Sequence, residues 1–413
     1  MADPIPAPRP SSATDGDTET NPRAERVLLD AAASPLHPAA REALLAALDA
    51  GWADPRRLYA EGRRARLLLD QAREALASGL GVRPPELSFL PGGPTALTAA
   101  VDGIRYAARR RGARLVASAV EHSAVLLPGR ALAAHAEDPT LLAEVPVDGV
   151  GRLDLAAWSD AVARPRTVVT ALQSANGEVG TRQPLEAAQA VCRHHGIPLV
   201  VDAMASLGRD PRPEAYDVLV GDARSWAGPA GVGVLVVPER TRWRRPGPVS
   251  ETEHGRTDVE PVVPLVVSAA EAWLQTEADH ADEATATRRL VDRVRLAAAA
   301  VPDTVVVGAP DDRLPHVVTF SCLFVDGEAL VHELDRRGFA VASGSACTAS
   351  TLEPSHVLSA MGVLTHGNVR ITLPLAATVA GGATVRAAGV DAFCRALPDA
   401  VATVRAQLGT DRL

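Results

Sequence analysis

Residues 198–237 read PLVVDAMASLGRDPRPEAYDVLVGDARSWAGPAGVGVLVV and contain three short apolar runs. The runs are PLVVDA (198–203), DVLVGD (217–222) and VGVLVV (232–237), each of strand length and rich in valine. Runs that are apolar at nearly every position predict strands buried on both faces of a sheet. This stretch therefore favours an α/β fold in which the sheet is covered on both sides.

Two earlier runs have the same character, RLVASAV (114–120) and TVVTAL (167–172). Between the strands lie segments with helical spacing of their apolar residues, such as PLEAAQAVCRHHG (184–196). Strands that alternate with helices are typical of a mainly parallel sheet. We expect such a sheet at the centre of a large domain.

The domain organisation follows from shifts in composition. Residues 1–25 contain acids, prolines and no apolar segment, which predicts a disordered tail rather than a signal peptide. Residues 26–265 are assigned to the large domain, and its polar stretch 239–262 is expected to be irregular. A long helix is expected over about 263–300, and residues 266–413 are assigned to a smaller α+β domain.

Composition excludes several classes of protein. The net charge of −8 argues against a nucleic-acid partner, and no apolar run approaches the roughly 20 residues of a membrane span. Cysteines are few, widely spaced and without metal-type pairs, so no metal site is expected and a reducing cytoplasm is favoured. The four are Cys192, Cys322, Cys347 and Cys394.

Polar residues follow three of the expected strands. His122 follows the first, Asn176 the second and Asp202 the third. The carboxyl ends of parallel strands form the edge where open α/β sheets bind ligands, so we expect these side chains to share a cleft. For Asp202, the alternative is an ordinary helix N-cap.

A glycine-rich turn precedes another expected helix in FLPGGPTALTAAVDGI (89–104). Glycines at a helix N-terminus let backbone N–H groups approach an anion, helped by the helix dipole. Gly92, Gly93 and Thr95 are therefore candidates for holding a phosphate. An ordinary strand-to-helix turn is an equally good interpretation.

Several motifs, in this order along the chain, resemble those of the cysteine desulfurases. These enzymes belong to the class V aminotransferase group and depend on pyridoxal phosphate (PLP). The motifs are EHSAV (121–125), NGEVG (176–180), VDAMAS (201–206), GPAGVGVLVV (228–237), SGSACTASTLEPSHVLSAMG (343–362) and NVRITL (368–373). The resemblance implies a PLP-transferase fold of type I and a homodimer with active sites near the subunit interface.

The resemblance also implies roles for individual residues. Asp202 would hold the pyridine nitrogen protonated, His122 would stack on the ring, and Asn176 would lie beside the cofactor oxygen and the substrate. Arg370 would bind the substrate carboxylate, a task suited to a bidentate guanidinium. Cys347 would attack the sulfur of the substrate and leave as a persulfide; the alternative is a small buried residue that fills space.

One residue type that the family needs is missing. All 42 basic residues counted as lysine or arginine are arginine, because the sequence contains no lysine. The family holds PLP as a Schiff base on the lysine of a His-Lys pair, and Arg224 and Ser225 occupy that pair here. Guanidinium forms no Schiff base, so PLP is the cofactor expected from the family but its covalent attachment is excluded.

Further cofactor contacts of the family are altered. Ala205 stands where the family has a cofactor-contacting glutamine, and the threonine of its phosphate loop falls at or beside Pro94. The family's RSGT segment, which reaches the partner subunit's phosphate, reads RTDV at 256–259. Losses at several contacts indicate relaxed selection for PLP rather than one unusual substitution.

Three hypotheses follow. The first is a cysteine desulfurase-like protein of sulfur metabolism in which Cys347 still forms a persulfide, although conventional PLP turnover is not expected. The second is a catalytically inactive paralogue that acts as scaffold or dimer partner of a lysine-bearing desulfurase. The third is a different ligand in the cofactor cleft, beside Gly92, Asp202 and Arg224. The expected partners are a second copy or a related subunit and a sulfur-acceptor protein, without nucleic acid or membrane.

Overall fold

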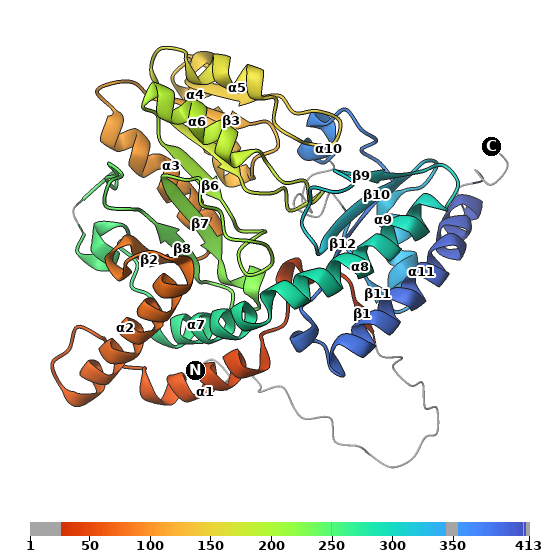
Figure 1. The fold of residues 1–413 in the computed structure, drawn as a ribbon, viewed down its shortest axis with the longest axis horizontal. Coiled ribbons are helices and arrows are strands. Elements are labelled where there is room, and N and C mark those ends of the chain that lie inside the picture. Colours follow the sequence, from red (N-terminus) through yellow and green to blue (C-terminus); the bar gives the residue numbers. More distant parts are fainter. Residues whose placement is uncertain (1–25, 249, 344–353, 408, 410–413) are drawn as a thin grey trace, which may run out of the picture.

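A computed structural model describes residues 26–248, 250–343, 354–407 and 409 (Figure 1). The tail expected over 1–25 and the candidate nucleophile Cys347 lie outside the described residues. Within them, no helix combines the length and apolar character needed to cross a bilayer.

The centre of the large unit is a seven-stranded sheet with the order β2-β8-β7-β6-β5-β3-β4. Five adjacent strands from β4 to β7 are parallel. At one edge β8 runs antiparallel to β7, and β2 runs antiparallel to β8, so β2 has the direction of the five. This confirms the expected α/β class with a mainly parallel sheet. The strands are β2 (Leu87–Leu90), β3 (Arg114–Ser118), β4 (Leu142–Val145), β5 (Thr167–Gln173), β6 (Leu199–Asp202), β7 (Val218–Asp222) and β8 (Gly233–Val236).

Helices cover both faces of this sheet, as the uniformly apolar strands predict. Val200 and Val220 point to one face, where α3 (Gly93–Ala108) and α4 (Ser123–His135) pack. Leu199 and Val201 point to the opposite face, which is covered by four other helices. These are α2 (Ala60–Leu80), α5 (Leu155–Val162), α6 (Leu185–His195) and α7 (Val263–Ala278).

A second core surrounds a smaller antiparallel sheet. Its central strand β10 (Val317–Cys322) lies between β9 (Thr304–Val307) and β12 (Asn368–Thr372). Packed around it are α8 (His280–Ala299), α9 (Gly327–Arg336) and α11 (Gly382–Gln407). Near the start of the described chain, β1 (Val27–Leu28) pairs in parallel with β11 (Phe339–Ala340) beside this core. The division at residue 265 stays a prediction.

The long helix expected over 263–300 is instead two helices, α7 and α8. They meet at Asp279, whose φ of −110° and ψ of 8° are not helical. The break has a tertiary cause, because the two halves bury their apolar residues against different partners. α7 packs on α1 (Pro38–Ala50) and α2, whereas α8 packs on α11 and the small sheet.

Candidate functional site

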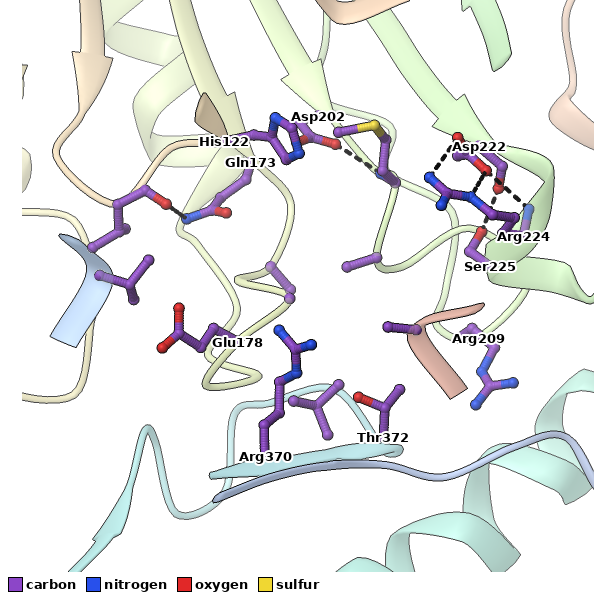
Figure 2. A pocket seen from close by; sticks show the side chains of 18 of the residues that line it. His122, Gln173, Glu178, Asp202, Arg209, Asp222, Arg224, Ser225, Arg370 and Thr372 are labelled. Atoms are coloured by element: carbon purple, nitrogen blue, oxygen red, sulfur yellow. Dashed lines mark hydrogen bonds and ion pairs between the residues drawn. The ribbon is translucent and has the colours of Figure 1, made fainter. Parts of the chain in front are cut away.

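A cleft of about 290 Å³ lies at the carboxyl ends of the parallel strands, between the large and small sheets (Figure 2). Its walls combine residues that are far apart in sequence. The large unit supplies His122, Asp202 and Asp222, and the small sheet and its neighbouring segments supply His316, Arg370 and Thr372. The cleft therefore lies at the edge of the sheet where open α/β sheets bind ligands.

Asp202 and His122 lie next to each other on one wall (Figure 2). Asp202 ends β6 and is only 6% exposed, and its Oδ1 accepts a hydrogen bond of 2.8 Å from the backbone N–H of Met204. Burial raises the pKa of Asp202 to about 7. His122 caps α4, since its Nδ1 accepts from the N–H of Ala124 at 3.0 Å, which leaves Nε2 available to the cleft.

A second carboxylate, Glu121, adjoins this wall and is completely buried. One of its oxygens accepts from the N–H of Gln173 at 2.7 Å, while Oε2 has no hydrogen-bond partner among the described residues. Burial, assisted by the charge of Asp202, raises the pKa of Glu121 to about 8. Within the described chain, neither carboxylate has a basic group within ion-pair distance.

Arg370 and Glu178 extend toward the same part of the cleft from the opposite wall (Figure 2). Arg370 comes from β12 and is 8% exposed, and its Nε has no hydrogen-bond partner in the described structure. Its nearest carboxylate oxygen in an ion pair, Oδ1 of Asp30, is 4.0 Å away. Burial raises the pKa of Glu178 to about 7, although the charge of Arg370 opposes this rise.

The N-terminus of α3 already holds an anionic group, the side chain of Asp222. Gly92, at φ +93°, turns the chain into the helix, and the N–H of Gly93 donates to Oδ2 of Asp222 at 2.7 Å. Arg224 donates to the same carboxylate through its backbone N–H, Nε and Nη2, at 3.0, 2.9 and 3.2 Å. Pro94 has no N–H to offer a further anion. The Asp222 carboxylate thus occupies the place beside the N–H of Gly93 where the sequence predicts a phosphate, which we call the anion seat.

Ser225 lies in the cleft wall, at the position where the family has its lysine. Its hydroxyl oxygen is 2.8 Å from the carbonyl oxygen of Leu207 and 2.9 Å from that of Asp222. A hydroxyl has one proton to donate, so these two carbonyls share it. Ser225 supplies no amine, and its hydroxyl stabilises the turn after β7 through these hydrogen bonds.

Asn176 and Thr95 are not among the residues that line the cleft. Asn176 is buried, where its side chain donates to the carbonyl of Val120 and accepts from the N–H groups of Glu178 and Val179. Thr95 is exposed, and its hydroxyl lies 3.3 Å from the carbonyl of Pro91. The roles assigned to them stay predictions.

The described residues that flank the cysteine segment lie at the cleft. Ala342 exchanges two backbone hydrogen bonds with Arg370, at 3.2 and 2.7 Å. On the other side, Nε2 of His356 is 3.0 Å from the carbonyl oxygen of Glu121. Ala342 and His356 therefore both contact residues that line the cleft.

Sequence reasoning missed several residues of the site. Asp222 follows a buried strand in the same way as Asp202, so the rule that found one carboxylate was sufficient to find the other. Glu121 and Glu178 stand inside motifs that were recognised, but their burial depends on the packing of distant segments. His316 carries no local signal.

Comparison with known proteins agrees with this geometry. The family model described as aminotransferase class V matches residues 26–381. A cysteine desulfurase of Cereibacter sphaeroides is 35% identical over 401 residues, which cover 92% of this chain and 97% of that protein. The IscS-like cysteine desulfurase of Mycobacterium tuberculosis is 32% identical over 394 residues, covering 91% and 96%.

Solved structures show the same fold. A NifS-like protein superposes with a TM-score of 0.81 at 22% identity, covering 92% of this chain and all of that one. DndA from Streptomyces lividans superposes with a TM-score of 0.70 at 27% identity, covering 83% and 98%. The chain therefore belongs to the class V aminotransferase family and is a relative of its cysteine desulfurases.

Proposed function

We propose that this protein is a cysteine desulfurase-like protein of sulfur metabolism that carries sulfur on Cys347 and does not run conventional PLP chemistry. The family is PLP-dependent, so the first question is whether the residues present fit that cofactor. The observation that carries the proposal is the Asp222 carboxylate at the N-terminus of α3, beside a serine in place of the lysine.

The fit fails at two independent points. No side chain of the sequence can form a Schiff base, since there is no lysine. The backbone N–H of Gly93 and the guanidinium of Arg224 are already bonded to Asp222. A phosphate brought to this seat would meet a carboxylate, and like charges at about 4 Å repel by roughly 4 kcal/mol near a protein surface. Asp202 and His122 alone do not offset these losses.

The sulfur-carrying role is proposed for Cys347, which stands in the segment that resembles the active-cysteine segment of the cysteine desulfurases. In the proposed step, the Cys347 thiolate attacks the terminal sulfur of a persulfide delivered by another protein. The new S–S bond forms on Cys347, and the donor cysteine leaves as a thiolate, so the transfer needs no oxidant or reductant. We place this exchange in the cytoplasm, with a sulfur-acceptor protein as the second partner.

The other cysteines are poor competitors for sulfur. Burial raises the pKa of Cys192 to about 11 and also raises that of Cys322, and a thiol must be deprotonated to attack. Cys394 is half-buried in α11, and burial raises its pKa as well. Selectivity for Cys347 is therefore expected.

The experiment is mass spectrometry of the protein after incubation with glutathione persulfide. The proposal expects the mass of one extra sulfur atom on the peptide that contains Cys347, and its loss in Cys347→Ser. Cys394→Ser serves as the matched control and should still be labelled. Labelling of Cys394 instead, or of no cysteine, contradicts the proposal.

A scaffold or subunit role is the second candidate, and exposed apolar residues favour it. Trp52 is 65% exposed and Leu58 is 86% exposed in the connection between α1 and α2, and Leu67 in α2 is 56% exposed. Such surface is typical of an interface. We propose a homodimer, or a heterodimer with a lysine-bearing relative; native mass spectrometry distinguishes them. Under the scaffold alternative, Cys347→Ala leaves biological function intact.

A further inference from the structure

The seat at the start of α3 is filled by a group that a ligand cannot easily displace. Asp222 is 3% exposed and accepts from four donors, one on Gly93 and three on Arg224. Hydrogen bonds between charged groups are among the strongest in proteins, and both carboxylate oxygens are engaged. An incoming phosphate would have to break this arrangement and remain beside Asp222.

The space around Gly93 is also too tight for rearrangement. A Cβ atom built on Gly93 would lie 2.4 Å from Sδ of Met204 and 2.8 Å from Cβ of Asp222. The carboxylate and its backbone donor are therefore held in place by packing as well as by hydrogen bonds. The anion seat is therefore filled by a side chain of the protein itself and has no room for a phosphate.

In the rest of the cleft, by contrast, several buried polar atoms have no hydrogen-bond partner among the described residues. Within the described residues, no hydrogen-bond partner reaches Oε2 of Glu121, Nδ1 of His316 or Oγ1 of Thr372, although each residue lines the cleft. Each is at most 6% exposed. Buried polar groups are nearly always satisfied in native proteins, so such a cluster indicates a missing ligand or water.

The charge of this cluster indicates the sign of the ligand. Glu121 and Asp202 both line the cleft and interact electrostatically, with no basic partner within ion-pair distance in the described structure. The ring of His122 lies beside Asp202 (Figure 2). Ionising two buried carboxylates is costly, which is why burial raises the pKa of both, and a bound cation would remove this cost. A ligand with a ring N–H⁺ or an ammonium group supplies what this wall lacks.

We propose that the cleft selects a small nitrogen heterocycle that carries positive charge and no phosphate, with Asp202 and Glu121 as its anionic partners and Asp222 as the group that rejects the phosphate. This inference rests on the part of the proposed function that excludes conventional PLP chemistry, and it extends that part by naming a ligand class for the cleft. A cleft of about 290 Å³ accommodates a single ring with short substituents.

Pyridoxamine and pyridoxamine 5′-phosphate are suitable probes, because they differ only in the phosphate and need no Schiff base. Binding of each is measured by isothermal titration calorimetry. The wild-type protein should bind pyridoxamine at least about tenfold more tightly than its phosphate, given the repulsion expected from Asp222. Asp222→Ser, which removes the charge and keeps a capping hydroxyl, should reverse the preference.

Asp202→Asn tests the other wall and should weaken pyridoxamine binding by at least about tenfold, as expected for the loss of a buried charge partner. Tighter binding of the phosphate by the wild type, an unchanged preference in Asp222→Ser, or binding of neither probe would overturn the inference. The persulfide assay on Cys347 involves neither probe. A negative result with the two probes therefore does not contradict the sulfur-carrying proposal, and a negative persulfide assay does not contradict the proposed ligand selectivity.

Discussion

Replacing Asp222 by alanine should empty the seat at the N-terminus of α3 and turn it into an anion site. The substitution removes a carboxylate shared by the N–H of Gly93 and three donors of Arg224. The N–H of Gly93, now without an acceptor, and the released Arg224 guanidinium then face the same small space. Both favour an anion, through the helix dipole and through direct charge.

The cost of the substitution follows from the exposure of its partners. Gly93 is buried, so an unsatisfied N–H there costs about 1–3 kcal/mol. The Arg224 side chain is 40% exposed and regains water, so its ion pair with Asp222 adds no more than about 1 kcal/mol. The free energy of unfolding should therefore fall by about 1–4 kcal/mol.

Inorganic phosphate should restore part of this loss in Asp222→Ala. At a concentration ten times its dissociation constant, a ligand of the folded state returns about 1.4 kcal/mol. Urea unfolding with and without phosphate, at constant ionic strength, measures the effect. Asp222→Asn is the matched control, since asparagine still accepts from Gly93 and keeps the seat filled. Equal responses to phosphate in the wild type and Asp222→Ala would refute the reasoning.

Three more predictions concern stability. Burial raises the pKa of Glu121 from 4.5 to about 8, so the folded state binds one more proton than the unfolded state between these pH values. The free energy of unfolding should therefore fall as the pH rises through this range, by up to about 1.4 kcal/mol per pH unit. Urea titrations at several pH values should show a smaller fall for Glu121→Gln. Arg73→Ala should cost about 3–5 kcal/mol in urea unfolding, because it leaves buried Glu253 without its cation; a cost near zero would contradict this. Gly93→Ala should lower the thermal midpoint through its clash with Asp222, equivalent to about 1–3 kcal/mol, and an unchanged midpoint would show that the turn relaxes freely.

The central sheet was predictable because its strands are buried on both faces. Runs such as 198–203 and 217–222 are apolar at almost every position, and only a strand covered on both sides requires this. The same regularity places Asp202 and His122 at one edge. Neither conclusion needs knowledge of how distant segments pack.

The remaining features depend on tertiary packing that local sequence does not encode. The break at Asp279 has no glycine or proline beside it, and it arises because α7 and α8 pack on different cores. The direction of the Asp222 side chain is decided by Gly93, which is 129 residues away in sequence. The burial of Glu121 likewise depends on packing against elements outside its own motif.

The visible absorption spectrum of the purified protein, taken after incubation with PLP and gel filtration, tests the central claim most directly. We predict no band from protein-bound coenzyme, because a serine stands at the anchoring position and a carboxylate fills the phosphate seat. A band that elutes with the protein and persists after gel filtration would contradict the account.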